Sequence, residues 1–101
     1  MPAYELGLAA ATAACAAAGE VTINQDLDPL SAEDVVNWVN GVIDGVAATG
    51  RAIKGIRVET PTFHALGIHR DVQNSGRYRG IIVVETMLGA IGTPVEVVIA
   101  A

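Results

Sequence analysis

The sequence is poor in the residue types on which many small functional sites depend. Cys15 is its only cysteine, which excludes an intrachain disulfide and a cysteine-rich metal knuckle. The thiol lies in an alanine run with no cationic residue nearby in the sequence, so we expect a small buried side chain rather than a nucleophile. Aromatic residues make up only 4% of the chain. The apolar core must therefore consist mainly of alanine and valine, which lets backbones approach closely.

Basic residues are absent from the first half of the sequence. Residues 1–50 contain seven acidic residues and no lysine or arginine, whereas residues 51–101 contain six basic and four acidic residues. Two explanations fit this asymmetry: neutralisation within one folded chain, or contact between an acidic and a basic face of neighbouring copies. The net charge of −5 and the lack of a basic stripe with interleaved aromatics predict no direct contact with nucleic acid.

Long apolar runs are also missing. No segment reaches the roughly 20 apolar residues that a membrane-spanning helix requires. Residues 6–18 are apolar, but no lysine or arginine precedes them, as an export signal would require. We therefore expect a soluble protein without a membrane partner, located inside the cell or within a virus particle.

The composition that remains suits one folded domain over residues 1–101. Apolar residues make up 51% of the chain and charged residues 17%, unlike the composition of disordered chains. A chain of this length forms about one domain. Because so few charged residues are available to cover its surface, we expect some apolar surface to contact other copies or partners.

The clearest predicted element is an amphipathic helix over residues 31–49. Ser31 is a suitable N-cap, the acidic Glu33 and Asp34 complement the helix dipole, and Gly50 is placed to end the helix. Apolar residues recur at intervals of three and four along one side of it: Val35, Trp38, Val39, Val42, Ile43 and Val46. This stripe predicts the side of the helix that faces the core.

The other side of the predicted helix carries Asn37, Gly41 and Gly45 at four-residue spacing. Each glycine lowers helix stability by about 1 kcal/mol relative to alanine. One interpretation is that a second backbone, for example the same helix of another copy, packs closely on this strip. The other is that the glycines are tolerated at an exposed face, and the sequence supports both equally.

The predicted fold class is α+β, with a mainly antiparallel sheet of about four strands packed against the helix at 31–49. Period-two patterns predict strands over residues 20–24, 51–60, 77–88 and 94–101. Strand 77–88 is apolar on both faces, which is typical of a central strand or of one covered by a second layer or subunit. The alanine-rich segment 9–18 fits a second helix or a strand equally well.

Chemically useful side chains concentrate in residues 62–71: His64, His69, Arg70 and Asp71. An acid–base role would require a histidine beside a carboxylate. The two histidines are five residues apart, a spacing that suits neither a strand nor a helix as a metal pair. The acidic residues between 26 and 34 lack the spacing and the glycine of an EF-hand. We therefore expect no metal and no cofactor.

These features favour a non-enzymatic, self-assembling subunit of a homo-oligomer or shell, such as a virion or capsid component, whose partners are copies of itself or other subunits of the assembly. The expected interface residues are Asn37, Gly41, Gly45, Val97 and Ile99. The alternative is a small oligomeric enzyme or small-molecule-binding protein with an interface site at His64, His69 and Arg70. No motif in the sequence identifies a reaction.

Overall fold

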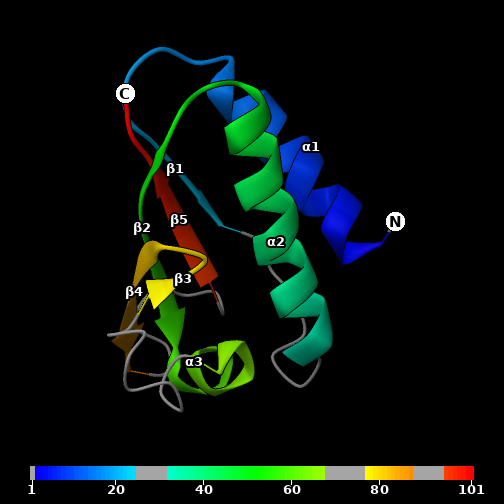
Figure 1. Cartoon of the computed structure of the whole chain (residues 1–101), viewed down its shortest axis with the longest axis vertical. Coiled ribbons are helices and arrows are strands. Elements are labelled where there is room, and N and C mark those ends of the chain that lie inside the picture. Colours follow the sequence, from blue (N-terminus) through cyan, green and yellow to red (C-terminus); the bar gives the residue numbers. More distant parts are fainter. Residues whose placement is uncertain (1, 25–31, 68–76, 88–94) are drawn as a thin grey trace.

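The computed structural model describes residues 2–24, 32–67, 77–87 and 95–101, and all structural statements below concern these residues. The elements are α1 (Ala3–Cys15), β1 (Val21–Asn24), α2 (Ala32–Ala48), β2 (Ile53–Glu59), α3 (Thr60–Leu66), β3 (Arg77–Tyr78), β4 (Ile81–Thr86) and β5 (Val95–Ile99). Figure 1 shows the sheet beside α1 and α2, with α3 at the end of β2. The predicted α+β class is therefore confirmed.

The sheet contains five strands in the order β1-β5-β2-β4-β3. Three neighbouring pairs are antiparallel, but β2 and β4 run parallel. Parallel strands need a crossover connection, and α3 begins that connection directly after β2. The expectation of about four mainly antiparallel strands is thus only roughly met, because the sheet has one more strand and is mixed.

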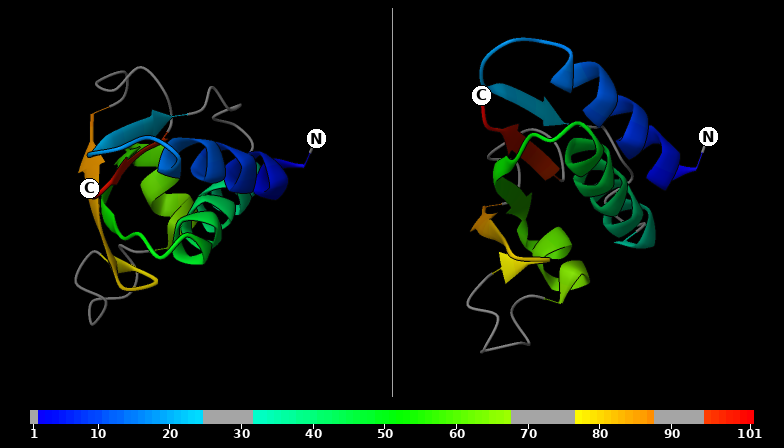
Figure 2. Two further views of the ribbon diagram at one scale, coloured as in Figure 1. Left: turned by 90° about the horizontal axis from the view of Figure 1, so that it is seen from above. Right: turned by 45° about the horizontal axis from the view of Figure 1, so that its top comes forward.

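The helices all lie on one face of the sheet, as the two views of Figure 2 show. The apolar stripe predicted for α2 is buried along its whole length, since Val35, Trp38, Val39, Val42, Ile43 and Val46 are each at most 8% exposed. These side chains pack with the inward residues of the central strands: Ile56, Val58, Val95, Val97 and Ile99. Gly50 follows the helix with a φ of +78°, which confirms its predicted role as the stop. The predicted cap, Ser31, lies outside the described residues.

The segment that the sequence left open between helix and strand forms α1. Alanine has the highest helix propensity, and α1 packs lengthwise against α2 (Figure 1). The last turn of α1 contains no basic residue, but Arg51 supplies the missing cation from a distant part of the chain. Its guanidinium donates to the carbonyl oxygens of Cys15 (3.2 Å), Ala17 (2.9 Å) and Gly19 (2.5 Å), and also to that of Ala100 (2.8 Å). Arg51 therefore satisfies free carbonyls at the end of α1 and joins them to the sheet.

The glycines of α2 face α1 of the same chain. A Cβ atom added to Gly41 would overlap the carbonyl oxygen of Tyr4, and one added to Gly45 would lie 2.8 Å from the Cβ of Ala11. Gly7 of α1 is the reciprocal contact, because its Cβ would overlap a backbone carbonyl of α2. A close backbone contact at Gly41 and Gly45, one of the two interpretations, is thus present, but α1 of the same chain makes it, which corrects the assignment of these two glycines to a contact between copies. Asn37 is half-buried, and its place in an interface stays a prediction.

Val97 and Ile99 are likewise core residues rather than interface residues. Both are 0% exposed, because β5 lies between β1 and β2 and turns these side chains toward the helices. The strand predicted over 94–101 is present as β5, and Val95, Val97 and Ile99 form its buried face. The assignment of Val97 and Ile99 to a subunit contact is corrected by the position of β5 inside the sheet.

The strand predicted over 77–88 is divided by a tight hairpin. Arg79 and Gly80 have φ values of +51° and +82°, as the two central residues of a type I′ turn require. They join β3 to β4 in an antiparallel pair. The strand predicted over 51–60 ends one residue early, because Thr60 already begins α3. Glu59 is buried there and Thr60 is exposed.

The ion pairs favour neutralisation within the chain as the explanation of the charge asymmetry. Of the three salt bridges among the described residues, Lys54–Glu20 and Arg79–Asp44 each join a base of the second half to an acid of the first. The third, Arg57–Glu96, lies within the second half. In the part of the chain that the structure describes, no helix is both long and apolar enough to cross a membrane.

Candidate interaction surface

The sheet face opposite the helices has no described helix packed on it (Figure 2), and we call it the open face. The strand register arranges its outward side chains in two rows across the sheet. One row runs through Thr22, Val98 and Gly55. The second runs through Asn24, Glu96, Arg57 and Val84. Side chains from four strands that are distant in sequence therefore form one continuous surface.

Apolar side chains occupy a large part of the open face. Ile82 and Val84 of β4 are 48% and 50% exposed. Val83, between them, is buried in the core. The prediction that this strand is apolar on both faces is thus confirmed for β4. No described element covers its second face, and an exposed apolar surface of this kind is typical of an interaction site.

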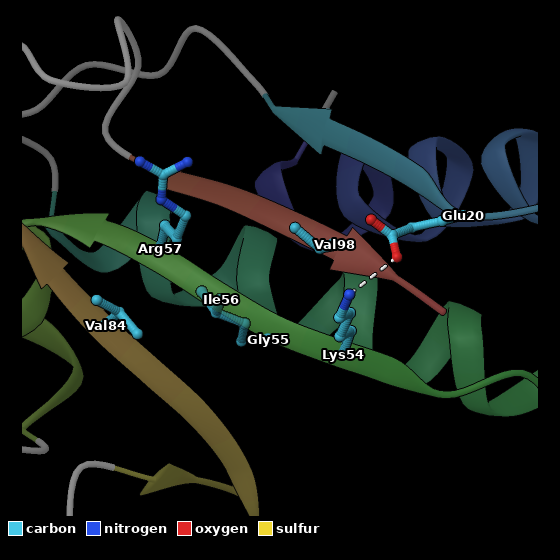
Figure 3. A pocket seen from close by; sticks show the side chains of 7 residues that line it. All are labelled: Glu20, Lys54, Gly55, Ile56, Arg57, Val84 and Val98. Carbon is cyan, nitrogen blue, oxygen red and sulfur yellow. Dashed lines mark hydrogen bonds and ion pairs between the residues drawn. The ribbon is translucent and has the colours of Figure 1, made fainter. Parts of the chain in front are cut away.

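A shallow groove of about 230 Å³ lies at the centre of the open face (Figure 3). It is lined by Glu20, Lys54, Gly55, Ile56, Arg57, Val84 and Val98. Gly55 creates the hollow, because a Cβ at this position would have a single neighbour within 4 Å, the carbonyl oxygen of Ile82 at 3.7 Å. The groove therefore has an apolar floor and a charged rim.

The charges on the rim form two ion pairs. Lys54 Nζ lies 3.1 Å from Glu20 Oε2, and Arg57 Nη1 lies 3.2 Å from Glu96 Oε1. Both basic side chains are about half exposed or more, so these pairs add little to the stability of the fold. Lys54 and Arg57 lie on β2 and form a basic column along the strand direction. Glu20 and Glu96 lie on the β1 and β5 side and form an acidic column beside it.

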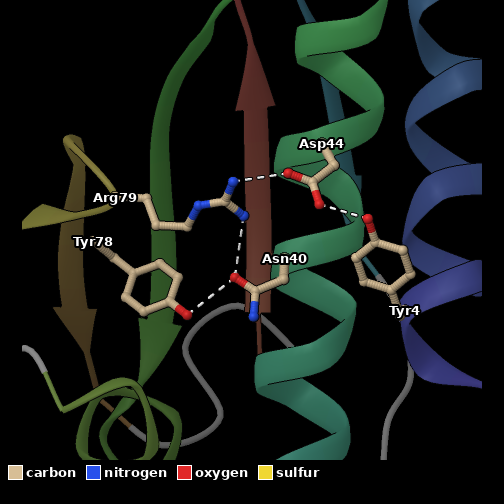
Figure 4. Close-up of polar contacts among 5 residues, drawn as sticks. All are labelled: Tyr4, Asn40, Asp44, Tyr78 and Arg79. Atoms are coloured by element: carbon tan, nitrogen blue, oxygen red, sulfur yellow. Dashed lines mark hydrogen bonds and ion pairs between the residues drawn. The ribbon is translucent and has the colours of Figure 1, made fainter.

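A second polar cluster joins α1, α2 and the β3–β4 hairpin on the helix side (Figure 4). Tyr4 Oη donates to Asp44 Oδ2 (2.5 Å), and Arg79 Nη2 donates to Asp44 Oδ1 (2.8 Å). Arg79 and Tyr78 both donate to Asn40 Oδ1, at 3.3 and 3.0 Å. The bonds from Tyr4 and Arg79 lower the pKa of Asp44, and the bond to Asp44 raises the pKa of Tyr4. Because both carboxylate oxygens of Asp44 already accept hydrogen bonds, we interpret this cluster as a structural tie.

The predicted acid–base residues are only partly placed. His64 lies exposed on α3 and does not line the groove. His69, Arg70 and Asp71 lie outside the described residues, so a site formed with them stays a prediction. Within the described ranges, no group of three or more His, Cys, Asp or Glu side chains is arranged to hold a metal ion.

The sequence contained signals for the rim residues that our prediction did not use. Arg57 alternates with Ile56 and Val58, and Glu96 alternates with Val95 and Val97, so both point away from the core. Their pairing across β2 and β5 depends on the register, which the sequence does not reveal. Comparisons with protein-family models, with curated proteins and with solved structures found no match for this chain.

Proposed function

We propose that the chain is a structural subunit that assembles with copies of itself through the open face of its sheet. One observation carries this proposal: Ile82 and Val84 are about half exposed on a sheet face without a described covering layer. Two sheets that pack face to face about 10 Å apart form the core of a β-sandwich. A second copy would bury these side chains in the same way.

The groove favours a protein partner over a small molecule. Ligand pockets usually have volumes of about 300–1,000 Å³ and enclose most of the ligand. The groove here is about 230 Å³ and shallow. Its two bases are matched by two acids, which is unlike the excess positive charge of a phosphate or nucleic-acid site. A surface with both signs of charge around an apolar centre has the composition of a protein interface.

This proposal keeps self-assembly as the expected function and moves the interface away from the glycine strip of α2 and from Val97 and Ile99. Incorporation into a larger shell, such as a virion, is the broader form of the same proposal. It would require further contacts in addition to the open face, because a single self-complementary face produces a closed dimer.

The proposal is tested by comparing Val84→Glu with a matched variant, Ala9→Glu, which places the same side chain on the exposed side of α1. Sedimentation equilibrium up to about 500 μM would populate an interface with a Kd in the micromolar range. We expect the wild type and Ala9→Glu to associate and Val84→Glu to remain monomeric with an unchanged circular dichroism spectrum. A wild type that is monomeric at every concentration would contradict the proposal.

A further inference from the structure

We infer that two copies pair through a two-fold axis that runs parallel to the strands, so that each basic column faces the acidic column of the other copy. This inference rests on the proposed self-assembly and specifies its geometry. The open face has a definite arrangement of charge, a hollow at Gly55 and a limited extent, and these three features support the inference.

The charges have a definite order on the sheet. Arg57 and Glu96 are register partners across β2 and β5, so they lie at the same height along the strands. Lys54 lies toward the other end of β2 and reaches Glu20, which precedes β1. Figure 3 shows Glu20 and Lys54 at one end of the groove and Arg57 at the other. Each base therefore has an acid beside it at its own height.

This order distinguishes between the two simplest ways of stacking the face on itself. A two-fold axis parallel to the strands exchanges the left and right sides of the sheet and keeps the height along the strands. Lys54 and Arg57 then face the partner copy's acidic column. An axis perpendicular to the strands keeps each column on its own side and places bases over bases. Juxtaposed like charges repel each other strongly at an interface, so the charges select the parallel axis.

The apolar centre of the face fits the same arrangement. Gly55 and Val98 are register partners on β2 and β5. An axis that passes between these two strands places Val98 of each copy over Gly55 of the other. The hollow left by Gly55 is lined by Ile56, Val84 and Val98, and it is open to receive a branched aliphatic side chain. One symmetry axis therefore accounts for the apolar centre and the charged rim together, and it places Val84 of each copy over Asn24 of the other.

The size of the face sets the expected strength of the contact. Five strands about 4.8 Å apart, with an average length of about five residues, give a footprint on the order of 400 Å² per copy. Stable complexes bury about 800 Å² per partner, so the contact falls in the class of weak, reversible interfaces. The exposed charges add salt dependence, because salt screens them efficiently. We expect a dimer that dissociates on dilution and at high ionic strength.

Charge reversal tests whether the charged columns of the two copies meet in the contact, and it uses three variants. The acidic-face variant is Lys54→Glu with Arg57→Glu, and the basic-face variant is Glu20→Lys with Glu96→Arg. The third combines all four changes, which exchanges the columns and keeps the net charge at −5. In sedimentation velocity, we expect each two-residue variant alone to associate at least about tenfold more weakly than the wild type. An equimolar mixture of the two should form a heterodimer, and the four-residue variant should associate like the wild type.

Gly55→Val tests the centre of the interface independently of charge. The open space at this position allows the substitution within the folded chain, but the added side chain fills the hollow that would receive Val98. We expect an unchanged melting temperature and at least a tenfold loss of association.

The outcomes separate this inference from the proposed function. Loss of association in Val84→Glu, with normal self-association of both two-residue charge variants, would overturn the axis and leave the proposed function standing. Failure of the mixed variants to form a heterodimer, when each alone is monomeric, would also overturn it. A monomeric wild type would remove both proposals.

Discussion

The two faces of the sheet differ in composition although the same strands form both. On the helix side, Val95, Val97 and Ile99 of β5 are fully buried in the core that α2 shares, and this face of β5 carries no charged side chain. On the open side, Val98 is half-buried and lies beside the Arg57–Glu96 ion pair. Residues that alternate along one strand thus have different roles. The buried face determines the fold, and the open face, which the fold does not require to be apolar, is where an interaction is expected.

The largest effect on stability is expected where α1 meets α2. Gly41→Ala should lower the free energy of unfolding by about 3 kcal/mol, because the new Cβ would overlap the Tyr4 carbonyl and force the helices apart. This loss exceeds the gain in helix propensity of about 1 kcal/mol. Urea denaturation followed by circular dichroism measures the difference.

Two controls refine the test of the helix contact. Gly45→Ala should cost less, since the atom it meets first is a side-chain carbon at 2.8 Å rather than a backbone oxygen. Ala47→Gly, on the exposed side of α2, should cost only the propensity difference of about 1 kcal/mol. If Gly41→Ala instead stabilised the protein, α1 would not occupy the strip.

An intermediate effect is expected from two adjacent valines of β5 that face opposite sides. Val97→Ala removes buried methyl groups and leaves a cavity, so unfolding should become easier by about 2 kcal/mol. Val98→Ala should cost less than about 1 kcal/mol, because its side chain is only half-buried. Thermal denaturation of both variants checks this, and equal losses would show that the two faces are buried alike.

The smallest effect is expected from the pH dependence of the Tyr4–Asp44 contact. The folded state lowers the pKa of Asp44, so this contribution is present above the ordinary value of 3.8 and disappears as the pH falls through the folded-state value. The pKa of Tyr4 is raised, so its contribution is present below 10.0 and disappears as the pH rises through the folded-state value.

Comparison of unfolding curves for the wild type and Tyr4→Phe across the pH range measures this contact. The wild type should have a small stability advantage at neutral pH that shrinks at both extremes. A difference that is independent of pH would mean that the hydrogen bond does not form in solution.

The elements with strong periodicity were predictable from the sequence. The stripe of α2 and the stop at Gly50 follow from local rules, as does the inward set of β5. Segment 9–18 could not be assigned, because alanine carries little information about burial and a helix this short is stable only when a neighbour packs against it. The hairpin at Arg79 and Gly80 was missed because arginine is uncommon at a positive φ.

The candidate surface was predictable only in part. The apolar second face of β4 was visible in the uninterrupted apolar run from Ile81 to Val84, which predicted a central strand or one covered by a second layer or subunit. The groove beside it was not visible, because it depends on the bulge and register that place Gly55 opposite Val98. Of the histidine cluster, only His64 lies among the described residues, so that hypothesis stands untested.

By itself, the sequence determined the periodic faces of α2 and the strands, and it offered a close backbone contact at Gly41 and Gly45 as one of two interpretations. Only the tertiary structure decided that α1 of the same chain makes this contact and that a different surface stays open. The reason is physical. A periodic pattern shows that one side of an element has apolar or small side chains, as burial requires. It does not show which backbone covers that side, because any backbone of suitable shape can do so.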